Sequence, residues 1–329
     1  MRILILGGTV FLGRNIVEAA LEKGHEVTLF NRGKTNQDLF SDVEKLTGDR
    51  ASNLESLKGR EWDVVIDPSG YLPGVVAETA SLLKDAVERY IFISSISVYR
   101  DFQEQYIDEG YPVGELEDES VKEINGETYG PLKALCEKTV EDIMPGRTLS
   151  IRPGLIVGPH DPSDRFTYWV ERFARGGDVL VPGEKNRPVQ WIDVRDLSRW
   201  IIQMAEQKET GVYNATGYDK ELTMGEFVNV LDHHHEDANP VWVDDACLLK
   251  HEISPFTELP MWIPVTDKHP HGFILASNQK ALDKGLSFRP ISETIKDTLA
   301  WYQSRLDPEL KNGLDAEKEA RVLEECTST

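Results

Sequence analysis

Near its N-terminus the chain reads Ile3-Leu4-Ile5-Leu6-Gly7-Gly8-Thr9-Val10-Phe11-Leu12-Gly13, a short apolar run that passes directly into a glycine turn. Residues 2–6, apolar from Ile3 onward, form a short run that predicts a buried parallel strand. Residues 15–24 follow with apolar side chains at helical spacing, and Gly24 predicts the end of that helix. This order predicts a dinucleotide-binding turn, because glycines let the backbone approach a pyrophosphate and the helix N-terminus faces its charge.

The glycines of this turn are expected to have separate tasks. Gly7 makes the sharp bend, and Gly13 lets the helix pack closely on the sheet. In the spacing GxxGxxG the middle position falls on Val10, so either Gly8 takes the close-approach role or the diphosphate sits slightly further out. The predicted cofactor contacts in this turn are Gly7, Gly8, Thr9, Phe11, Leu12 and Gly13.

The rest of the N-terminal half alternates between strand and helix patterns. We expect strands at 26–30, 63–67, 90–94 and 149–153, with the clearest intervening helix at 77–86. Such alternation is typical of an α/β fold, here a Rossmann-type doubly wound parallel sheet with helices on both faces.

Beyond residue 153 the pattern loosens into proline-rich loops and short helices, expected at 166–174, 194–206 and 223–232. We interpret this part as a smaller substrate lobe. The expected division is a dinucleotide-binding domain over 1–153, a mainly substrate-binding lobe over 154–306 from which some segments return to the Rossmann core, and a helical tail over 307–329. A charged helix at 315–325 would cap a surface or fray.

The composition is typical of a globular protein in water. The 329 residues suffice for a large core, with 40% hydrophobic and 28% charged residues. No apolar run approaches the roughly 18 residues of a membrane span, and the apolar run at 4–6 is too short for a signal peptide. The formal charge of −21 repels phosphate backbones at long range. We therefore expect no membrane partner, and broad nucleic-acid binding is disfavoured.

The cysteine and histidine spacings show neither a disulfide frame nor a metal motif. Cys136, Cys247 and Cys326 are too few and too scattered for a disulfide frame or a CxxC metal knuckle. His233-His234-His235 cannot share one helical face, and no Cys or acidic pair stands nearby at ligand spacing. We expect no metal, a helix end at the histidines, and a reducing cytoplasm as the protein's location.

The end of the second strand bears on the choice of nicotinamide cofactor. An NAD enzyme usually carries an acid there for the ribose 2′-hydroxyl, whereas this chain has Asn31-Arg32-Gly33-Lys34. The Arg32 guanidinium would suit a 2′-phosphate. Asn31 and Arg32 are therefore predicted cofactor contacts, and NADP is favoured over NAD.

A second group of residues is suited to moving a proton. Tyr129 precedes Lys133 by four residues, and on a helix the two side chains share a face. A free tyrosine has a pKa of about 10, and a nearby ammonium would lower it toward the range of a useful acid or base. Ser95 follows a predicted strand, where parallel sheets place ligands, and its hydroxyl can hydrogen-bond a substrate oxygen. The three residues form the predicted catalytic set.

These motifs make the chain resemble the extended and atypical short-chain dehydrogenase/reductase superfamily, in its NAD-dependent epimerase/dehydratase branch. The stretches Arg152-Pro153-Gly154-Leu155-Ile156-Val157-Gly158-Pro159 and Trp191-Ile192-Asp193-Val194-Arg195-Asp196-Leu197 match the same pattern. The turn without a middle glycine is more similar to an atypical subgroup, which includes uncharacterised bacterial reductase-like proteins and chloroplast stem-loop RNA-binding proteins.

The resemblance implies a role for further positions. Asp49 and Arg50 would lie by the adenine, and Lys133 would also reach the nicotinamide ribose. The remaining implied cofactor contacts are Pro68, Ser69 and Gly70 after the fourth strand, and Pro153 and Gly154 beneath the nicotinamide. The family expectation is also a homodimer formed through the helices that carry the Tyr-x-x-x-Lys motif.

The substrate side departs from the nucleotide-sugar epimerases. The arginine that often holds a nucleotide diphosphate falls on Val189, although Arg187 is close, and Gly154-Leu155 replaces an asparagine that often contacts the sugar nucleotide. The candidate substrate contacts are Tyr99, His160, Arg165 and Trp169, and a purely structural loop is an equal alternative for the last three. A UDP-sugar substrate is thus not supported.

Three functions remain open. The first is an NAD(P)-dependent oxidoreductase for a small molecule, with Tyr129 as acid or base and hydride transfer at a carbon–oxygen centre. The second is an epimerase or dehydratase acting on a sugar or nucleotide sugar with a retained NAD. The third is a non-catalytic NAD(P)- or RNA-associated binding protein, which the intact Ser95, Tyr129 and Lys133 and the charge of −21 disfavour. The active site is expected at the C-terminal edge of the sheet, with the 154–170 loop closing over it.

Overall fold

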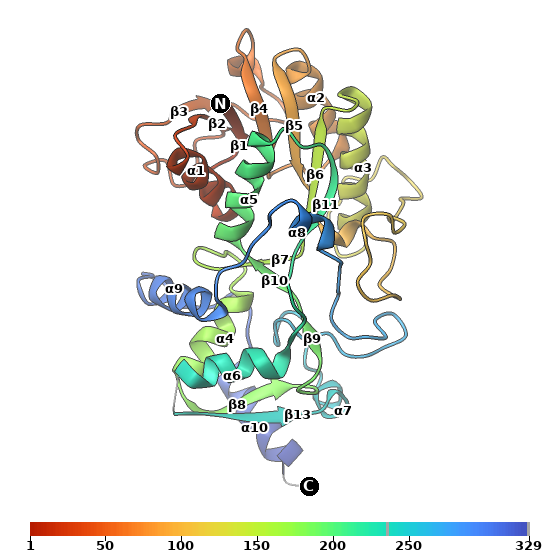
Figure 1. Cartoon of the computed structure of the whole chain (residues 1–329). Helices are drawn as coiled ribbons and strands as arrows, with labels where there is room; N and C mark the ends of the chain where they lie inside the picture. The colour runs from red at the N-terminus through yellow and green to blue at the C-terminus, as the bar shows by residue number, and fades with distance from the viewer. Residues whose placement is uncertain (235–236, 328–329) are drawn as a thin grey trace.

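The computed structural model describes residues 1–234 and 237–327. The chain forms two parts that lie end to end (Figure 1), which we call the sheet domain and the C-terminal lobe. The described part of the sheet domain contains one seven-stranded sheet in the order β11-β6-β5-β4-β1-β2-β3, and every neighbouring pair in it is parallel. The predicted doubly wound parallel sheet is confirmed.

The strands of this sheet follow the expected order, with two additions. The predicted strands correspond to β1 (Arg2–Leu6), β2 (Glu26–Asn31), β4 (Trp62–Asp67), β5 (Val87–Ile93) and β6 (Thr148–Pro153). The additions are β3 (Glu44–Thr47) at one edge and β11 (Gly211–Ala215) at the other. Because β11 pairs with β6, a late segment of the chain completes the sheet.

Helices cover both faces of the sheet, and alternating strand residues decide which face they meet. Ile3 and Ile5 share a buried cluster with α1 (Phe11–Glu22) and α5 (Val194–Glu206). Leu4 and Leu6 point the other way, into a cluster with α2 (Pro73–Leu83) and α3 (Tyr129–Ile143). The helix expected at 77–86 is displaced toward the N-terminus, since Pro73 occupies its first turn, where proline is tolerated.

The C-terminal lobe packs around a parallel pair of strands, β8 (Gly177–Pro182) and β13 (Ala238–Val243). Its helices are α4 (Arg165–Ala174), α6 (Met224–His234), α7 (Asp245–Lys250), α9 (Ile291–Gln303) and α10 (Ala316–Thr327). Trp169, Trp191 and Phe227 are fully buried in its core. His233 and His234 lie in the last described turn of α6, and His235 lies outside the described residues, so the expected helix end at the histidines stays a prediction.

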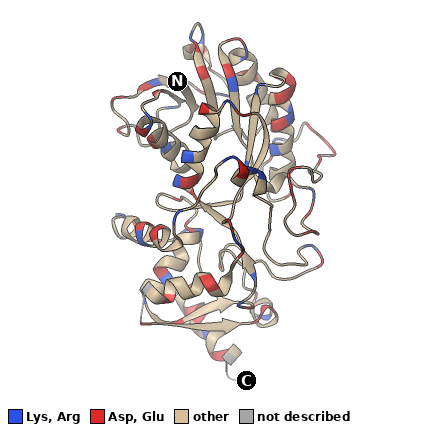
Figure 2. Ribbon diagram, in the orientation of Figure 1, with Lys and Arg blue, Asp and Glu red and all other residues tan. Residues whose placement is uncertain are grey.

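Short elements connect the two parts. They are β7 (Leu155–Val157) paired with β10 (Trp191–Asp193), β9 (Pro188–Val189) paired with β12 (Leu222–Thr223), and α8 (Gln279–Asp283). Two single turns, η1 (Glu55–Leu57) and η2 (Ile96–Val98), complete the described elements. Acidic and basic residues mingle over both parts (Figure 2). Within the described ranges no helix combines the length and apolar character that a membrane crossing requires.

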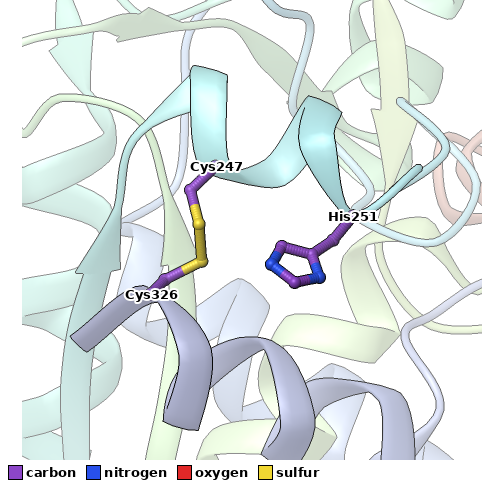
Figure 3. A group of neighbouring side chains, drawn as sticks. All are labelled: Cys247, His251 and Cys326. Atoms are coloured by element: carbon purple, nitrogen blue, oxygen red, sulfur yellow. A yellow bond between two sulfur atoms is a disulfide. The ribbon is translucent and has the colours of Figure 1, made fainter. Parts of the chain in front are cut away.

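The cysteine prediction is wrong, because Cys247 and Cys326 form a disulfide across 79 residues of sequence. Cys247 lies on α7 and Cys326 in the last turn of α10, and the two helices pack side by side (Figure 3). The inference of a reducing cytoplasm from the cysteine spacing thereby loses its basis. The C-terminal helix does not fray either: Glu319 and Val322 of α10 are buried, and Glu319 accepts two hydrogen bonds from Arg172 of α4.

Candidate active site

A cavity of about 670 Å³ lies along the carboxyl ends of the sheet strands. The structure brings together at its wall every predicted cofactor contact except Gly70, whose carbonyl instead accepts a hydrogen bond from Lys133. Ser95 and Tyr129 line the same cavity. The predicted cofactor contacts that line it are Gly7, Gly8, Thr9, Phe11, Leu12, Gly13, Asn31, Arg32, Asp49, Arg50, Pro68, Ser69, Lys133, Pro153 and Gly154.

The glycine turn has the geometry that a dinucleotide requires. Gly7 and Gly8 adopt positive φ angles of 122° and 97°, a region that favours glycine. A Cβ on Gly13 would lie 2.9 Å from the backbone nitrogen of Gly8, so only glycine lets α1 approach the turn so closely. The residue that caps α1, Val10, offers no side-chain hydrogen bond. The first N–H groups of α1 are therefore available to a phosphate, and the residues present fit the cofactor.

The end of β2 presents cations to the rim of the cavity. The Asn31 amide donates to the Gly7 carbonyl at 3.1 Å and accepts from the Gly33 N–H at 2.9 Å, so it braces the glycine turn. Arg32 and Lys34 are exposed and line the cavity. Neither forms an ion pair with any residue of the described ranges, so no carboxylate there neutralises their charges.

A buried ion pair, for which the sequence has no local signal, supports the cavity wall at Arg50. Arg50 donates to both oxygens of Asp67 at 2.6 and 2.7 Å, and the Tyr90 hydroxyl donates to the same carboxylate at 2.7 Å. Burial opposes the charge of Asp67, but Arg50, Tyr90 and the N–H of Ser69 outweigh it and lower the pKa of the carboxyl. Asp67 is therefore a fixed anion that orients Arg50 at the wall.

Ser95 and Tyr129 meet at the end of β5. The Ser95 side chain interacts with the Tyr129 hydroxyl and accepts a hydrogen bond from the Ser97 N–H at 3.1 Å. Gly130 makes this meeting possible, because a Cβ on that residue would lie only 2.0 Å from the Ser97 carbonyl oxygen. The start of α3 thus rests directly on the backbone of η2, and this contact sets the position of Tyr129.

Lys133 is buried beneath Tyr129 and faces the backbone. Its Nζ donates to the carbonyls of Gly70 and Ile93 at 2.7 and 2.6 Å and lies 4.3 Å from the centre of the Phe92 ring. Burial lowers the pKa of Lys133 to about 8. Burial also raises the pKa of Tyr129 above its ordinary value, as does the neighbouring Tyr71. The prediction of a lowered Tyr129 pKa is wrong for this arrangement, in which the ammonium is engaged by carbonyls.

Two of the predicted substrate contacts are wrong because they are buried elsewhere. The Tyr99 side chain is 3% exposed, and its hydroxyl donates to Asn214 at 2.6 Å. Trp169 is fully buried in the core of the C-terminal lobe and donates from Nε1 to the Pro260 carbonyl at 2.9 Å. Trp169 sits on the buried face of the amphipathic α4, a position that an irregular loop would not have given it.

The other two predicted substrate contacts are not among the residues that line the cavity. The His160 ring packs on Trp301 and lies 3.4 Å from the Arg14 guanidinium. Arg165 donates to the Phe256 carbonyl at 3.3 Å. Their role in substrate binding stays a prediction. Two other residues of the expected closing loop, Ile156 and Pro162, do line the cavity.

Comparisons with known proteins identify the family. The sequence profile described as the NAD dependent epimerase/dehydratase family matches residues 3–82 and 72–216, which together span more than half of the chain. The chain belongs to this family of enzymes. The resemblance found in the sequence is thereby confirmed.

Two curated relatives of this chain share less than 30% sequence identity with it. The chain is 27% identical over 244 residues to the chloroplast stem-loop binding protein of 41 kDa b from Arabidopsis thaliana, a match that covers 66% of this chain and 58% of that protein. It is 24% identical over 250 residues to the human epimerase family protein SDR39U1, covering 70% of this chain and 79% of that protein. The chain therefore spans little more than half of the first relative's length.

Solved structures show the same fold. UDP-glucuronic acid 4-epimerase from Bacillus cereus in complex with NAD superposes with a TM-score of 0.65 at 15% identity, covering 92% of this chain and 98% of that one. UDP-glucose 4-epimerase from Thermotoga maritima superposes with a TM-score of 0.66 at 17% identity, covering 93% of this chain and 100% of that one. At these identities the likeness shows the fold alone.

Proposed function

We propose that this chain is an NADP(H)-linked oxidoreductase that transfers hydride at a carbon–oxygen centre of a small molecule. The observation that carries the proposal is that Ser95 and Tyr129 lie together in the wall of the cavity that the glycine turn also lines. When bound, the nicotinamide supplies or accepts the hydride. The protein has to supply the proton, and Tyr129 is the group placed to do so.

The three predicted catalytic residues divide the work. The Ser95 hydroxyl orients the reacting oxygen, and Tyr129 donates the proton to that oxygen or removes it. Lys133 fixes the backbone below Tyr129, because its ammonium donates to the carbonyls of Gly70 and Ile93. A bound cofactor ribose would offer the ammonium new partners nearer Tyr129. Exchange of partners would then lower the pKa of Tyr129, whose proton is otherwise held by burial.

The preference for NADP(H) rests on the rim of the cavity. No carboxylate stands at the end of β2, the Asn31 amide is occupied by the turn, and Arg32 is an unpaired cation within the described ranges. Arg32→Ala should weaken NADPH binding by about tenfold or more and leave NADH binding unchanged, since only the 2′-phosphate is lost as a partner. Titration calorimetry of both nucleotides measures this. Arg60→Ala, which removes an exposed arginine paired with Glu44, is the control.

The second candidate is an epimerase or dehydratase that retains NAD through the catalytic cycle. The family match favours it. A nucleotide-sugar substrate has less support, because both guanidinium nitrogens of Arg187 donate to Asp245 at 2.9 Å and the arginine does not line the cavity. Denaturing the purified protein and identifying released nucleotides by mass spectrometry separates the candidates. Near-stoichiometric NAD(H) would overturn the exchanging reductase, and NADP(H) that washes out would support it.

The catalytic assignment has its own test. Tyr129→Phe removes only the hydroxyl, so the variant should bind NADPH as the parent does and lose turnover in a screen of carbonyl substrates. A parent protein that binds nucleotide and turns over no substrate in that screen would instead favour a binding protein, as the name of the Arabidopsis relative would suggest.

A further inference from the structure

Three potential metal ligands meet at the far end of the C-terminal lobe, remote in sequence from the glycine turn. Cys247 and His251 stand four residues apart at α7, one helical turn that places both on one face. Cys326 reaches them from the last turn of α10. The ligand atoms of the three residues all lie within 4.8 Å of one another. Figure 3 shows the imidazole ring turned toward the two sulfur atoms.

The imidazole of His251 has no hydrogen bond that explains this placement. Its Nε2 is shielded from solvent and has no hydrogen-bond partner in the described part of the chain. The nearest carboxylate oxygen, on Glu325, is 3.6 Å away, beyond hydrogen-bond range. Shielded polar nitrogens are nearly always satisfied in native proteins. The nitrogen therefore lacks a partner that a bound ion would supply.

We propose that Cys247, His251 and Cys326 form a Zn²⁺-binding site when the two cysteines are reduced, and that the disulfide is its oxidised, metal-free form. Two thiolates and one imidazole are a ligand set that Zn²⁺ prefers, at roughly 2.3 Å for sulfur and 2.0 Å for nitrogen. In a tetrahedron of that size the ligand atoms lie about 3.8 Å apart or less. The observed atoms lie within 4.8 Å of one another, so the nitrogen needs to approach the sulfurs by at most about 1 Å once reduction has let the two sulfurs separate. Glu325 is positioned to contribute the fourth ligand.

The site is held together by contacts other than the disulfide. Glu319 of α10 accepts from Arg172 at 2.7 and 3.0 Å and from the Leu180 N–H at 3.0 Å. Lys318 donates to both oxygens of Glu258 at 2.6 and 2.8 Å. Because these contacts dock α10 on the lobe, reduction of the disulfide leaves the thiols close together and ready to bind an ion.

The interconversion is balanced as a two-electron thiol–disulfide exchange. In the loading direction the protein disulfide and two molecules of glutathione give two protein thiolates, which take up Zn²⁺, together with glutathione disulfide and two protons. In the reverse direction glutathione disulfide accepts the two electrons, the sulfur–sulfur bond forms between Cys247 and Cys326, and Zn²⁺ leaves. Both states link α10 to α7: the reduced state through the bound Zn²⁺ and the oxidised state through the disulfide.

Metal titration of the full chain tests the proposal. After reduction with a phosphine and removal of metal by a chelator, the chain should bind one equivalent of Zn²⁺, and Co²⁺ should produce a thiolate-to-metal charge-transfer band. The glutathione-disulfide-oxidised chain should show no such band. His251→Asn keeps both cysteines, so it should still form the disulfide while its metal affinity falls by about 10- to 100-fold or more.

Two variants serve as controls. His271→Asn changes an exposed histidine, and Cys136→Ser removes the buried free thiol of the sheet domain; both should keep one equivalent and the charge-transfer band. The proposal is overturned if the reduced parent binds Co²⁺ without that band, which would indicate surface carboxylates, or if His251→Asn binds Zn²⁺ as tightly as the parent. If His251→Asn binds Zn²⁺ as tightly as the parent, Cys247 and Cys326 form a disulfide and do not belong to a metal site with His251.

Discussion

Gly130→Ala tests whether the backbone contact between α3 and η2 positions Tyr129. An added Cβ would lie 2.0 Å from the Ser97 carbonyl oxygen, whereas ordinary contacts begin at 3.4 Å, so the two elements must separate by about 1.4 Å (3.4 minus 2.0). The obstacle is a backbone carbonyl, which cannot rotate away as a side chain can. Gly74 is a matched control, because it too is the second residue of a helix and a Cβ there would meet nothing within 4 Å.

The two substitutions should move stability in opposite directions. Crowding of this kind costs about 1–3 kcal/mol of unfolding free energy, whereas alanine in place of an unobstructed helical glycine adds about 0.5–1 kcal/mol. Equilibrium unfolding in urea should therefore separate Gly130→Ala from Gly74→Ala by about 1.5–4 kcal/mol. A shift of Tyr129 by about 1 Å should also lower turnover about a hundredfold, with NADPH binding retained.

Equal unfolding free energies for the two variants would refute this reasoning, since they would show that α3 does not rest on η2 as described. If Gly130→Ala lost stability but kept its turnover, the predicted effect of Gly130 on the position of Tyr129 would be refuted. In that case the position of Tyr129 would depend on Ser95 and the bound cofactor rather than on the glycine that follows it.

Further predictions concern the buried charges and the cofactor rim. Asp67→Asn leaves the buried guanidinium of Arg50 without its carboxylate and should lower the unfolding free energy, measured in urea, by about 3–5 kcal/mol. The control Asp63→Asn, at a surface pair, should lower it by less than about 1 kcal/mol. Equal losses for the two variants would contradict the prediction for Asp67. Burial lowers the folded-state pKa of Lys133 from 10.5 to about 8, so the unfolded chain binds more protons between those values. The stability of the parent relative to Lys133→Met should thus rise with pH, by up to about 3 kcal/mol between pH 8 and 10.5, and a difference independent of pH would show that the ammonium keeps its ordinary pKa. Nucleotide titration of Arg32→Ala should change NADPH affinity alone, and a matching loss for NADH would mean that the arginine supports the fold of the rim.

Local signals in the sequence were sufficient for five strands of the sheet and for the glycine turn. The run from Ile3 to Gly13 carries the strand, the bend and the helix start within one stretch, so its structure follows from neighbouring residues. The strand β11 has no such pattern, because Gly211–Ala215 is short and becomes a strand only by pairing with β6. Its place in the sheet depends on packing that no window of sequence contains.

The parts of the site that escaped prediction depend on long-range contacts. Asp67 ends an apolar strand and precedes the cavity residues Pro68 and Ser69, but its pairing with Arg50 requires β3 and β4 to be placed first. Cys247 and Cys326 are 79 residues apart, and only the docking of α10 brings them together. The pKa of Tyr129 likewise depends on where the Lys133 ammonium points, which the four-residue spacing does not determine.

The path of the chain between its two parts also limits how such a protein can change. The chain leaves the sheet domain after β6, returns at α5, leaves again after β11, returns at α8 and ends in the C-terminal lobe. A transplanted lobe would therefore need several simultaneous junctions, so recombination of whole lobes between relatives is an improbable route to a new substrate. Point substitutions and loop insertions around the cavity are the accessible route. A protease that cuts one connection would leave the halves joined by the others, and the nicked protein would remain in one piece.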